Sequence, residues 1–213
     1  MRGVGAGNPR EHLFFLLKED KNIDSVKMLY RGGMKGGVWG GSIHWKHYIP
    51  GMERLKKILG LEDTENFEVL NTLFPDIKFI HLHRLNKIKQ AISYIKACQS
   101  GVFSHSDSEQ AKDFNFRYSK EEIEKTILTF SEWEARWLDL TKKYNIEPHV
   151  ITYEDLCAKP AKVLQGILEF LGVSVLTNEP FEEYIQKSEL PIRQYNTTSE
   201  NWYQRYLNEM SRK

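Results

Sequence analysis

The chain has 213 residues, of which 40% are apolar, 28% charged and 12% aromatic, and its formal net charge is +1. This length and composition are typical of a globular protein with a substantial core, and they exclude an intrinsically disordered chain. The near-zero net charge excludes a broad basic field for nucleic acid, so any anion site must be local. No apolar run approaches the roughly 20 residues that a membrane-spanning helix needs.

The first residues predict a helix that carries a candidate catalytic group. Met1–Gly7 is glycine-rich and lacks the apolar stretch of a signal peptide. Asn8 offers a helix cap, Pro9 suits the first helical position, and Glu11 follows as in a capping box. The Glu11 carboxylate can either satisfy the cap of its own helix or act as a general base at the mouth of that helix.

A glycine-rich segment follows. Arg31–Gly37 predicts a flexible basic loop, and Val38–Trp45 predicts a strand that two adjacent glycines interrupt. Paired glycines inside a strand indicate either a bulge or a close approach of the backbone to a ligand, and the sequence leaves both open. Met52–Leu73 predicts a helical stretch that is interrupted near Gly60.

The most informative stretch is Asp76–Gly101, where a strand passes directly into a helix. The apolar residues of 77–82 predict a short buried strand. Asn86 then offers an N-cap, apolar residues recur at helical spacing, and Gly101 ends the helix. Arg84 therefore follows the carboxyl end of a strand, which is where parallel α/β sheets bind their ligands.

Arg84 is a candidate phosphate ligand at this junction. Lys89, Ser93 and Lys96 follow at i, i+4 and i+7 and form a polar basic stripe along the predicted helix. The Arg84 guanidinium, the Ser93 hydroxyl and the N–H groups at the helix N-terminus could together hold one phosphate. From the spacing alone, a surface arginine and a surface serine that bind nothing are the more common case.

A long helix is predicted in the second half of the chain. Phe103–Tyr118 is polar and irregular, as expected of an excursion or a mobile lid. Ser119 and Glu122 then form a capping box, and helical periodicity continues to about Tyr144.

The remaining elements complete an α/β pattern. Residues 148–153 predict a second short strand, followed by a helix that Gly172 ends and by a capped C-terminal helix from Ser199. The alternation of strands and helices predicts one α/β domain over residues 1–213, with a parallel sheet flanked by helices.

Cysteine and histidine usage gives no sign of a metal site. Cys98 and Cys157 fall on predicted helices among apolar neighbours, so we expect buried thiols in a reducing compartment and a cytoplasmic protein. The seven histidines do not fall into metal-ligand spacing with these cysteines, and the sequence predicts no metal.

Three blocks of sequence occur in an order that is fairly specific as a set. They are Gly7–Glu11; then Val38–Gly41 with His83-Arg84 and Gln90–Ser93; and then Ile151–Leu156 with Arg193-Gln194 and Ser199–Tyr206. In these blocks the chain resembles the bacterial trehalose and lipooligosaccharide-type sulfotransferases, relatives of the larger group that uses 3′-phosphoadenosine 5′-phosphosulfate.

The resemblance implies a sulfotransferase fold, with a P-loop-NTPase-like parallel sheet, and transfer of a sulfuryl group from that nucleotide to a carbohydrate or glycolipid hydroxyl. Arg84 and Ser93 match the positions that hold the 3′-phosphate. Tyr153 matches the tyrosine that meets the adenine, and Arg193 looks like a second phosphate contact. Glu11 falls on the general base, which would accept the proton of the attacking alcohol. The resemblance also allows a homodimer.

The chain departs from the family pattern at several points. The family begins with a strand and an R-S/T-G-S-T loop that cradles the 5′-phosphosulfate, whereas this sequence starts just before Gly7. Ser42, Asn86 and Asn196 stand where the family has lysine, aspartate and aspartate. We therefore expect an N-terminally incomplete fold. Either the true start lies upstream of Met1, or the chain is a non-catalytic remnant or binding module that keeps at most the 3′-phosphate clasp.

Overall fold

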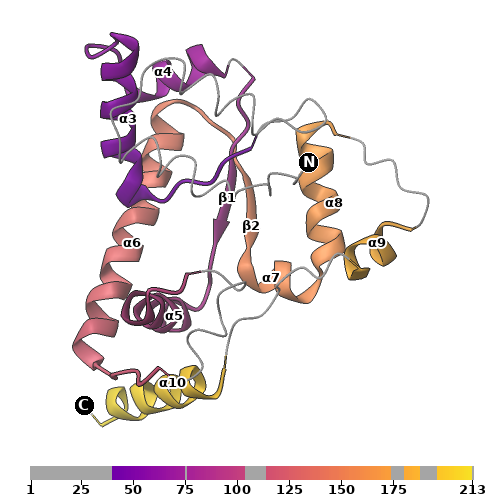
Figure 1. Ribbon diagram of the computed structural model, residues 1–213. Coiled ribbons are helices and arrows are strands. Elements are labelled where there is room, and N and C mark those ends of the chain that lie inside the picture. The colour runs from indigo at the N-terminus through magenta and orange to yellow at the C-terminus, as the bar shows by residue number, and fades with distance from the viewer. Residues whose placement is uncertain (1–39, 75, 104–113, 174–179, 188–195, 213) are drawn as a thin grey trace, which may run out of the picture. The chain divides into compact units, whose positions relative to one another are not determined.

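A computed structural model describes residues 40–74, 76–103, 114–173, 180–187 and 196–212 (Figure 1). The chain divides into two compact units, one that ends at Ile77 and one that begins at Lys78. Glu11, the loop Arg31–Gly37 and Arg193 lie outside the described residues. Of the helices in the described ranges, none is long and apolar enough to cross a membrane.

The first unit contains two described helices, α3 (Trp45–Leu59) and α4 (Asn66–Leu73). The predicted interruption is confirmed, because Gly60 ends α3 with φ 68°, a left-handed conformation that favours glycine. Tyr48 and Met52 of α3 and Val69 of α4 are the buried apolar side chains of these helices.

The prediction of a strand over Val38–Trp45 is wrong for its described part. Residues 40–44 have no regular structure, and α3 begins at Trp45. Trp45, Tyr48 and Met52 lie on one helical stripe, and the rings of the first two are 5.4 Å apart. Burial along this stripe outweighs the local strand signal of the preceding residues.

The second unit is built on two parallel strands, β1 (Ile80–His83) and β2 (His149–Thr152). Ile80 pairs with His149 and His83 pairs with Thr152, so the two strands end level with each other. The residues that follow the strands therefore emerge at the same edge of the sheet. This confirms the predicted pair of strand-to-helix junctions.

Six described helices accompany these strands in the second unit (Figure 1). They are α5 (Lys87–Ser100), α6 (Lys120–Lys143), α7 (Tyr153–Ala158), α8 (Pro160–Leu171), α9 (Phe181–Lys187) and α10 (Thr197–Met210).

The predicted caps of α5 and α6 are confirmed. The Asn86 side chain accepts a hydrogen bond from the backbone N–H of Lys89 at 2.9 Å, and the Ser119 hydroxyl accepts one from Glu122 at 3.1 Å. Gly101 ends α5 with φ 73°. These local signals were sufficient because each satisfies backbone groups within one helical turn.

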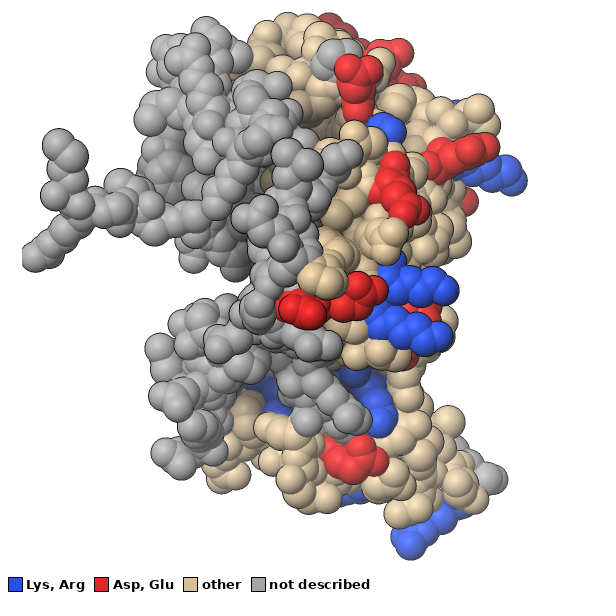
Figure 2. All heavy atoms as spheres, turned by 90° about the vertical axis from the view of Figure 1, so that its right-hand side faces the viewer, with Lys and Arg blue, Asp and Glu red and all other residues tan. Residues whose placement is uncertain are grey.

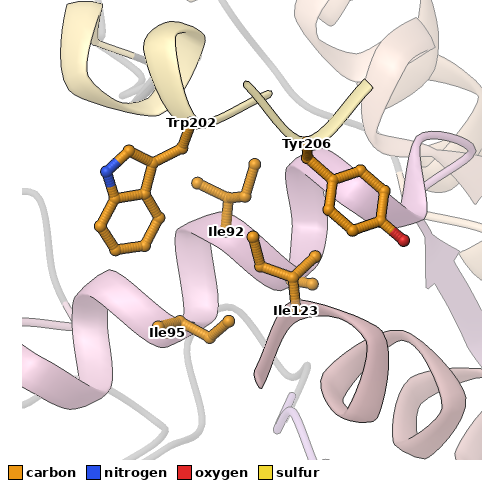
Figure 3. Close-up of a cluster of buried hydrophobic side chains, with 6 residues drawn as sticks. Ile92, Ile95, Ile123, Trp202 and Tyr206 are labelled. Atoms are coloured by element: carbon orange, nitrogen blue, oxygen red, sulfur yellow. The ribbon is translucent and has the colours of Figure 1, made fainter. Parts of the chain in front are cut away.

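The core of the second unit lies where α5, α6 and α10 meet (Figure 3). Its members are fully or nearly fully buried: Ala91, Ile92 and Ile95 of α5, Ile123 of α6, and Trp202 and Tyr206 of α10. Burying one such aliphatic side chain stabilises a fold by about 1.5–3 kcal/mol. This packing holds α5 in place, and with it the junction that carries Arg84.

Two burial predictions need correction. The strand β1 is not buried, because Ile80 and Leu82 are 40% and 52% exposed. Both side chains point to one face of the sheet, and that face is only partly covered. Cys98 is also exposed, since it lies in the last turn of α5, past Lys96, the last buried residue of that helix, whereas Cys157 is half-buried. Both cysteines are free thiols.

Candidate functional site

Two predicted site residues meet at the carboxyl ends of the strands. Arg84 directly follows β1 and Tyr153 directly follows β2, and the parallel register brings them side by side. The Arg84 guanidinium carbon lies 4.4 Å from the centroid of the Tyr153 ring. The Arg84 side chain is only 14% exposed. This cation–π contact is worth about 0.5–2 kcal/mol and holds the guanidinium on the ring face.

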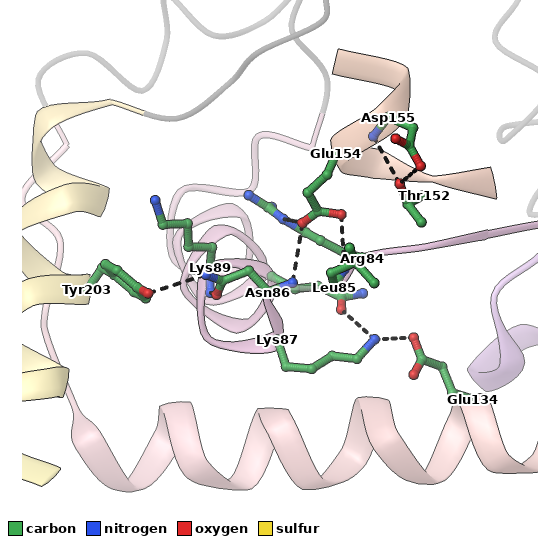
Figure 4. Close-up of polar contacts among 11 residues, drawn as sticks. Arg84, Leu85, Asn86, Lys87, Lys89, Glu134, Thr152, Glu154, Asp155 and Tyr203 are labelled. Carbon is green, nitrogen blue, oxygen red and sulfur yellow. Dashed lines mark hydrogen bonds and ion pairs between the residues drawn. The ribbon is translucent and has the colours of Figure 1, made fainter. Parts of the chain in front are cut away.

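A third residue, Glu154, joins this pair (Figure 4). Its carboxylate accepts hydrogen bonds from the backbone N–H groups of Leu85, at 3.0 Å, and Asn86, at 3.3 Å. One carboxylate oxygen is also 3.9 Å from Arg84 Nε. Burial alone would raise the pKa of Glu154, but these two backbone bonds and the charge of Arg84 hold that pKa below its usual value. Glu154 is therefore ionised at neutral pH.

The hydrogen-bonding groups of Arg84 are not used by the described residues. Its Nε is buried without a hydrogen-bond partner, and the ion pair with Glu154 is too long to be a hydrogen bond. No described residue accepts a hydrogen bond from its Nη groups. Because most buried polar groups in proteins are paired, these unused donors make Arg84 a candidate for binding an anion.

The basic stripe of α5 faces α10. Lys96 is 8% exposed and donates to Asn196 Oδ1 at 2.6 Å and Ser199 Oγ at 2.9 Å. Lys89 lies 3.5 Å from the Glu200 carboxylate. Burial lowers the pKa of Lys96 below its usual value. Lys89 and Lys96 therefore contact the N-terminal region of α10 and do not form a solvated basic surface.

Ser93 lies between these two lysines on the same face of α5 and is half-buried. Its hydroxyl makes no hydrogen bond to the part of the chain that the structure describes. The helical rise places it about 10 Å along the axis from the N-terminus of α5. The structure therefore brings Arg84 to Tyr153, whereas no hydrogen bond joins Arg84 and Ser93.

Further polar side chains near the end of β1 are His81 and His83 of the strand and the pair Lys87 and Glu134. The rings of His81 and His83 are 5.6 Å apart, and Lys87 forms an ion pair with Glu134 of α6 (Figure 4). Burial, and then the nearby charge of His83, lower the pKa of His81, while Glu134 opposes this effect. In the described ranges, no group of three or more histidine, cysteine or carboxylate side chains is placed to hold a metal ion.

Charge on the face shown in Figure 2 is mixed where the residues are described. On the face shown in Figure 2, the coloured basic and acidic side chains are interspersed, and neither sign covers a continuous area.

Sequence reasoning missed Glu154 as a member of the site. It was recognised only as part of a sequence block, because its partners Leu85 and Asn86 lie 69 and 68 residues away in the sequence. The strand register that joins them cannot be derived from one sequence. Glu11 and Arg193 lie outside the described residues.

Comparison with known proteins identifies the family to which the chain belongs. The sequence profile of the Stf0 sulphotransferase family matches residues 17–209. Over 186 residues the chain is 26% identical to the trehalose 2-sulfotransferase of Mycolicibacterium smegmatis, and over 184 residues it is 25% identical to that of Mycobacterium tuberculosis. Each match covers 85% of this chain and 65% of the relative.

The chain belongs to the Stf0 sulphotransferase family. This confirms the resemblance to bacterial trehalose-type sulfotransferases that the sequence blocks indicated. The helices and the small parallel sheet agree with the predicted α/β class. The chain spans about 65% of the length of the curated relatives that it matches.

Proposed function

We propose that this protein transfers a sulfuryl group from 3′-phosphoadenosine 5′-phosphosulfate to a hydroxyl of a carbohydrate or glycolipid. The family and the names of its relatives support this reaction class. The observation that carries the proposal is the state of Arg84, which lies at the carboxyl end of β1 with its Nη groups unbonded to described residues. A guanidinium with free Nη groups is suited to bind a phosphate through bidentate hydrogen bonds.

The proposed roles are those that the resemblance to the sulfotransferase family implies for each residue. Arg84 and Ser93 hold the nucleotide 3′-phosphate, Tyr153 meets the adenine, and Arg193 contributes a second phosphate contact. The acceptor oxygen attacks sulfur, its proton passes to the Glu11 carboxylate, and the bond between sulfur and the bridging phosphate oxygen breaks. Adenosine 3′,5′-bisphosphate leaves, and cations or N–H groups stabilise the charge that develops on it.

We also propose that β1 and β2 belong to a P-loop-NTPase-like parallel sheet and that residues 1–213 form one sulfotransferase domain. The family match supports this because it runs from residue 17 to residue 209 and so includes residues of both compact units. The parallel pairing of β1 with β2 is the arrangement that such a sheet requires.

The transfer assay tests this proposal. The protein is incubated with the nucleotide donor and trehalose, the acceptor named for both relatives, and sulfated sugar is measured by mass spectrometry. We expect product, a rate at least tenfold lower for Arg84→Ala, and an unchanged rate for Arg136→Ala. Arg136 is the matched control because it is exposed and pairs with Glu132 on the surface of α6. Equal rates for wild type and Arg84→Ala would contradict the role of Arg84.

A second candidate function is nucleotide binding without transfer. The observation that favours it is the contact of Arg84 with the Tyr153 ring, which supports nucleotide binding but does not by itself provide for transfer. Thermal-shift measurements with adenosine 3′,5′-bisphosphate separate the two functions. Stabilisation by this nucleotide without sulfated product supports a binding module, and sulfated product excludes it.

A further inference from the structure

The Glu154 carboxylate links the segment that follows β1, which carries Arg84, to the segment that follows β2, which carries Tyr153. Glu154 belongs to the first turn of α7 and directly follows Tyr153, on whose ring Arg84 lies. Its two oxygens accept from the N–H groups of Leu85 and Asn86, which are the two residues after Arg84 (Figure 4). These hydrogen bonds therefore join the segment that carries Arg84 to the segment that carries Tyr153.

These contacts restrict both ends of the Arg84 side chain. The two backbone bonds fix the orientation of the junction from which the side chain leaves. At the other end, the Glu154 carboxylate attracts Nε from 3.9 Å while the Tyr153 ring supports the guanidinium plane at 4.4 Å. Nε is the Arg84 nitrogen recorded in the ion pair with Glu154, which leaves both Nη nitrogens for a ligand.

The charge of Glu154 is compatible with this role. A carboxylate near an anion site repels the anion unless its own charge is taken up by donors. Here both carboxylate oxygens are bonded to backbone N–H groups, and the side chain is 36% exposed. Glu154 can therefore orient Arg84 without occupying the Nη groups.

We propose that Glu154 is a positioning residue, which holds the Arg84 guanidinium on the Tyr153 ring so that its Nη groups face the 3′-phosphate of the nucleotide. The inference rests on the proposed function, because it assumes that Arg84 binds that phosphate. Glu154 acts through Arg84 and does not touch the nucleotide.

The test uses two nucleotides that differ in the 3′-phosphate. Affinities for adenosine 3′,5′-bisphosphate and adenosine 5′-monophosphate are measured by isothermal titration calorimetry for wild type and Glu154→Gln. Glutamine keeps the size of the side chain, but its NH₂ group would oppose one of the two backbone N–H groups. We expect a loss of about tenfold or more for the bisphosphate and of less than about twofold for the monophosphate.

A double-mutant cycle shows whether the effect passes through Arg84. In the Arg84→Ala background, Glu154→Gln should cause no further loss of bisphosphate affinity. A purely structural role of Glu154 would instead weaken both nucleotides equally and would add to the effect of Arg84→Ala. Glu169→Gln, on the exposed surface of α8, is the control and should bind as wild type.

The binding measurements distinguish failure of the inference on Glu154 from failure of the proposed function. If wild type binds the bisphosphate and Glu154→Gln binds it equally well, or if the two substitutions are additive, the inference is overturned and the proposed function stands. If wild type does not bind the bisphosphate, both are overturned. Should Glu154→Gln not fold, Glu154→Asp replaces it, because aspartate keeps the charge but is too short to reach both N–H groups. The same 3′-phosphate-specific loss is then expected.

Discussion

Replacing Asn196 by alanine should destabilise the protein more than replacing Lys96 by methionine. Lys96 is a buried cation whose hydrogen bonds end on neutral groups, Asn196 Oδ1 and Ser199 Oγ. Asn196 also caps α10, since its Oδ1 accepts from the backbone N–H of Ser199 at 3.1 Å. Losing Asn196 therefore removes a helix cap and leaves a buried ammonium with one partner fewer.

The change in the free energy of unfolding can be estimated for each substitution from the contacts that it removes. Loss of the cap costs about 1 kcal/mol, and loss of a hydrogen bond to a buried charge costs about 1.5–3 kcal/mol, so Asn196→Ala should cost about 2.5–4 kcal/mol. Lys96→Met removes the hydrogen bonds together with the cost of burying the charge, and the new side chain can pack on Phe116, so it should cost only about 0–1 kcal/mol.

Urea unfolding followed by circular dichroism measures these free energies. In the Lys96→Met background, Asn196→Ala should cost only the cap, which gives a coupling of about 1.5–3 kcal/mol between the two sites. Ser119→Ala is the matched control, because Ser119 caps α6 without a buried lysine, and it should cost about 1 kcal/mol. A cost for Asn196→Ala no larger than that of Ser119→Ala, or an additive cycle, would refute the reasoning.

Three further predictions concern the core, a helix end and the junction. Ile92→Ala should destabilise the protein by about 2–5 kcal/mol in urea unfolding, whereas Leu128→Ala, which is 71% exposed, should cost less than about 0.5 kcal/mol; similar costs would contradict the assigned core. Gly172→Ala should lower stability by about 1 kcal/mol, because Gly172 has φ 70°, and an unchanged melting temperature would argue against that conformation. The lowered pKa of Glu154 implies a contribution to stability that is present at neutral pH and is lost as pH falls below the ordinary carboxyl pKa. Unfolding curves measured in that pH window should show a smaller loss of stability for Glu154→Gln than for wild type. Identical pH profiles of the two proteins would refute the assignment.

The helices of this fold could be predicted where their signals are local. Asn86 and Ser119 begin helices, and Gly101 and Gly172 end them, as the sequence indicated. A cap satisfies backbone groups of its own turn, so the pattern can be recognised without knowing the rest of the fold.

Burial and the limits of the strands could not be predicted in the same way. Ile80 and Leu82 form an apolar run that is typical of a buried strand, yet they are exposed because the sheet face they occupy is only partly covered. Helix α3 begins at Trp45 because Tyr48 and Met52 are buried on one helical stripe. The strand prediction for the residues before it was based on the local sequence alone. These properties depend on neighbours distant in the sequence.

The candidate site shows the same division. Arg84 and Ser93 were predicted from their place at a strand-to-helix junction, and Tyr153 from the family resemblance. Only the register of β1 with β2 shows that Arg84 lies on the Tyr153 ring and that Glu154 accepts hydrogen bonds from the residues that follow Arg84. The roles of Glu11 and Arg193 stay predictions, because both residues lie outside the described ranges.

The most direct test of the central claim is the affinity of adenosine 3′,5′-bisphosphate for wild type and Arg84→Ala, measured by isothermal titration calorimetry. If Arg84 holds the 3′-phosphate with charge-assisted hydrogen bonds worth about 1.5–3 kcal/mol, its loss should weaken binding roughly 10- to 150-fold, while adenosine 5′-monophosphate should be affected much less. Equal affinity of both proteins for the bisphosphate, or no binding by wild type, would contradict the account.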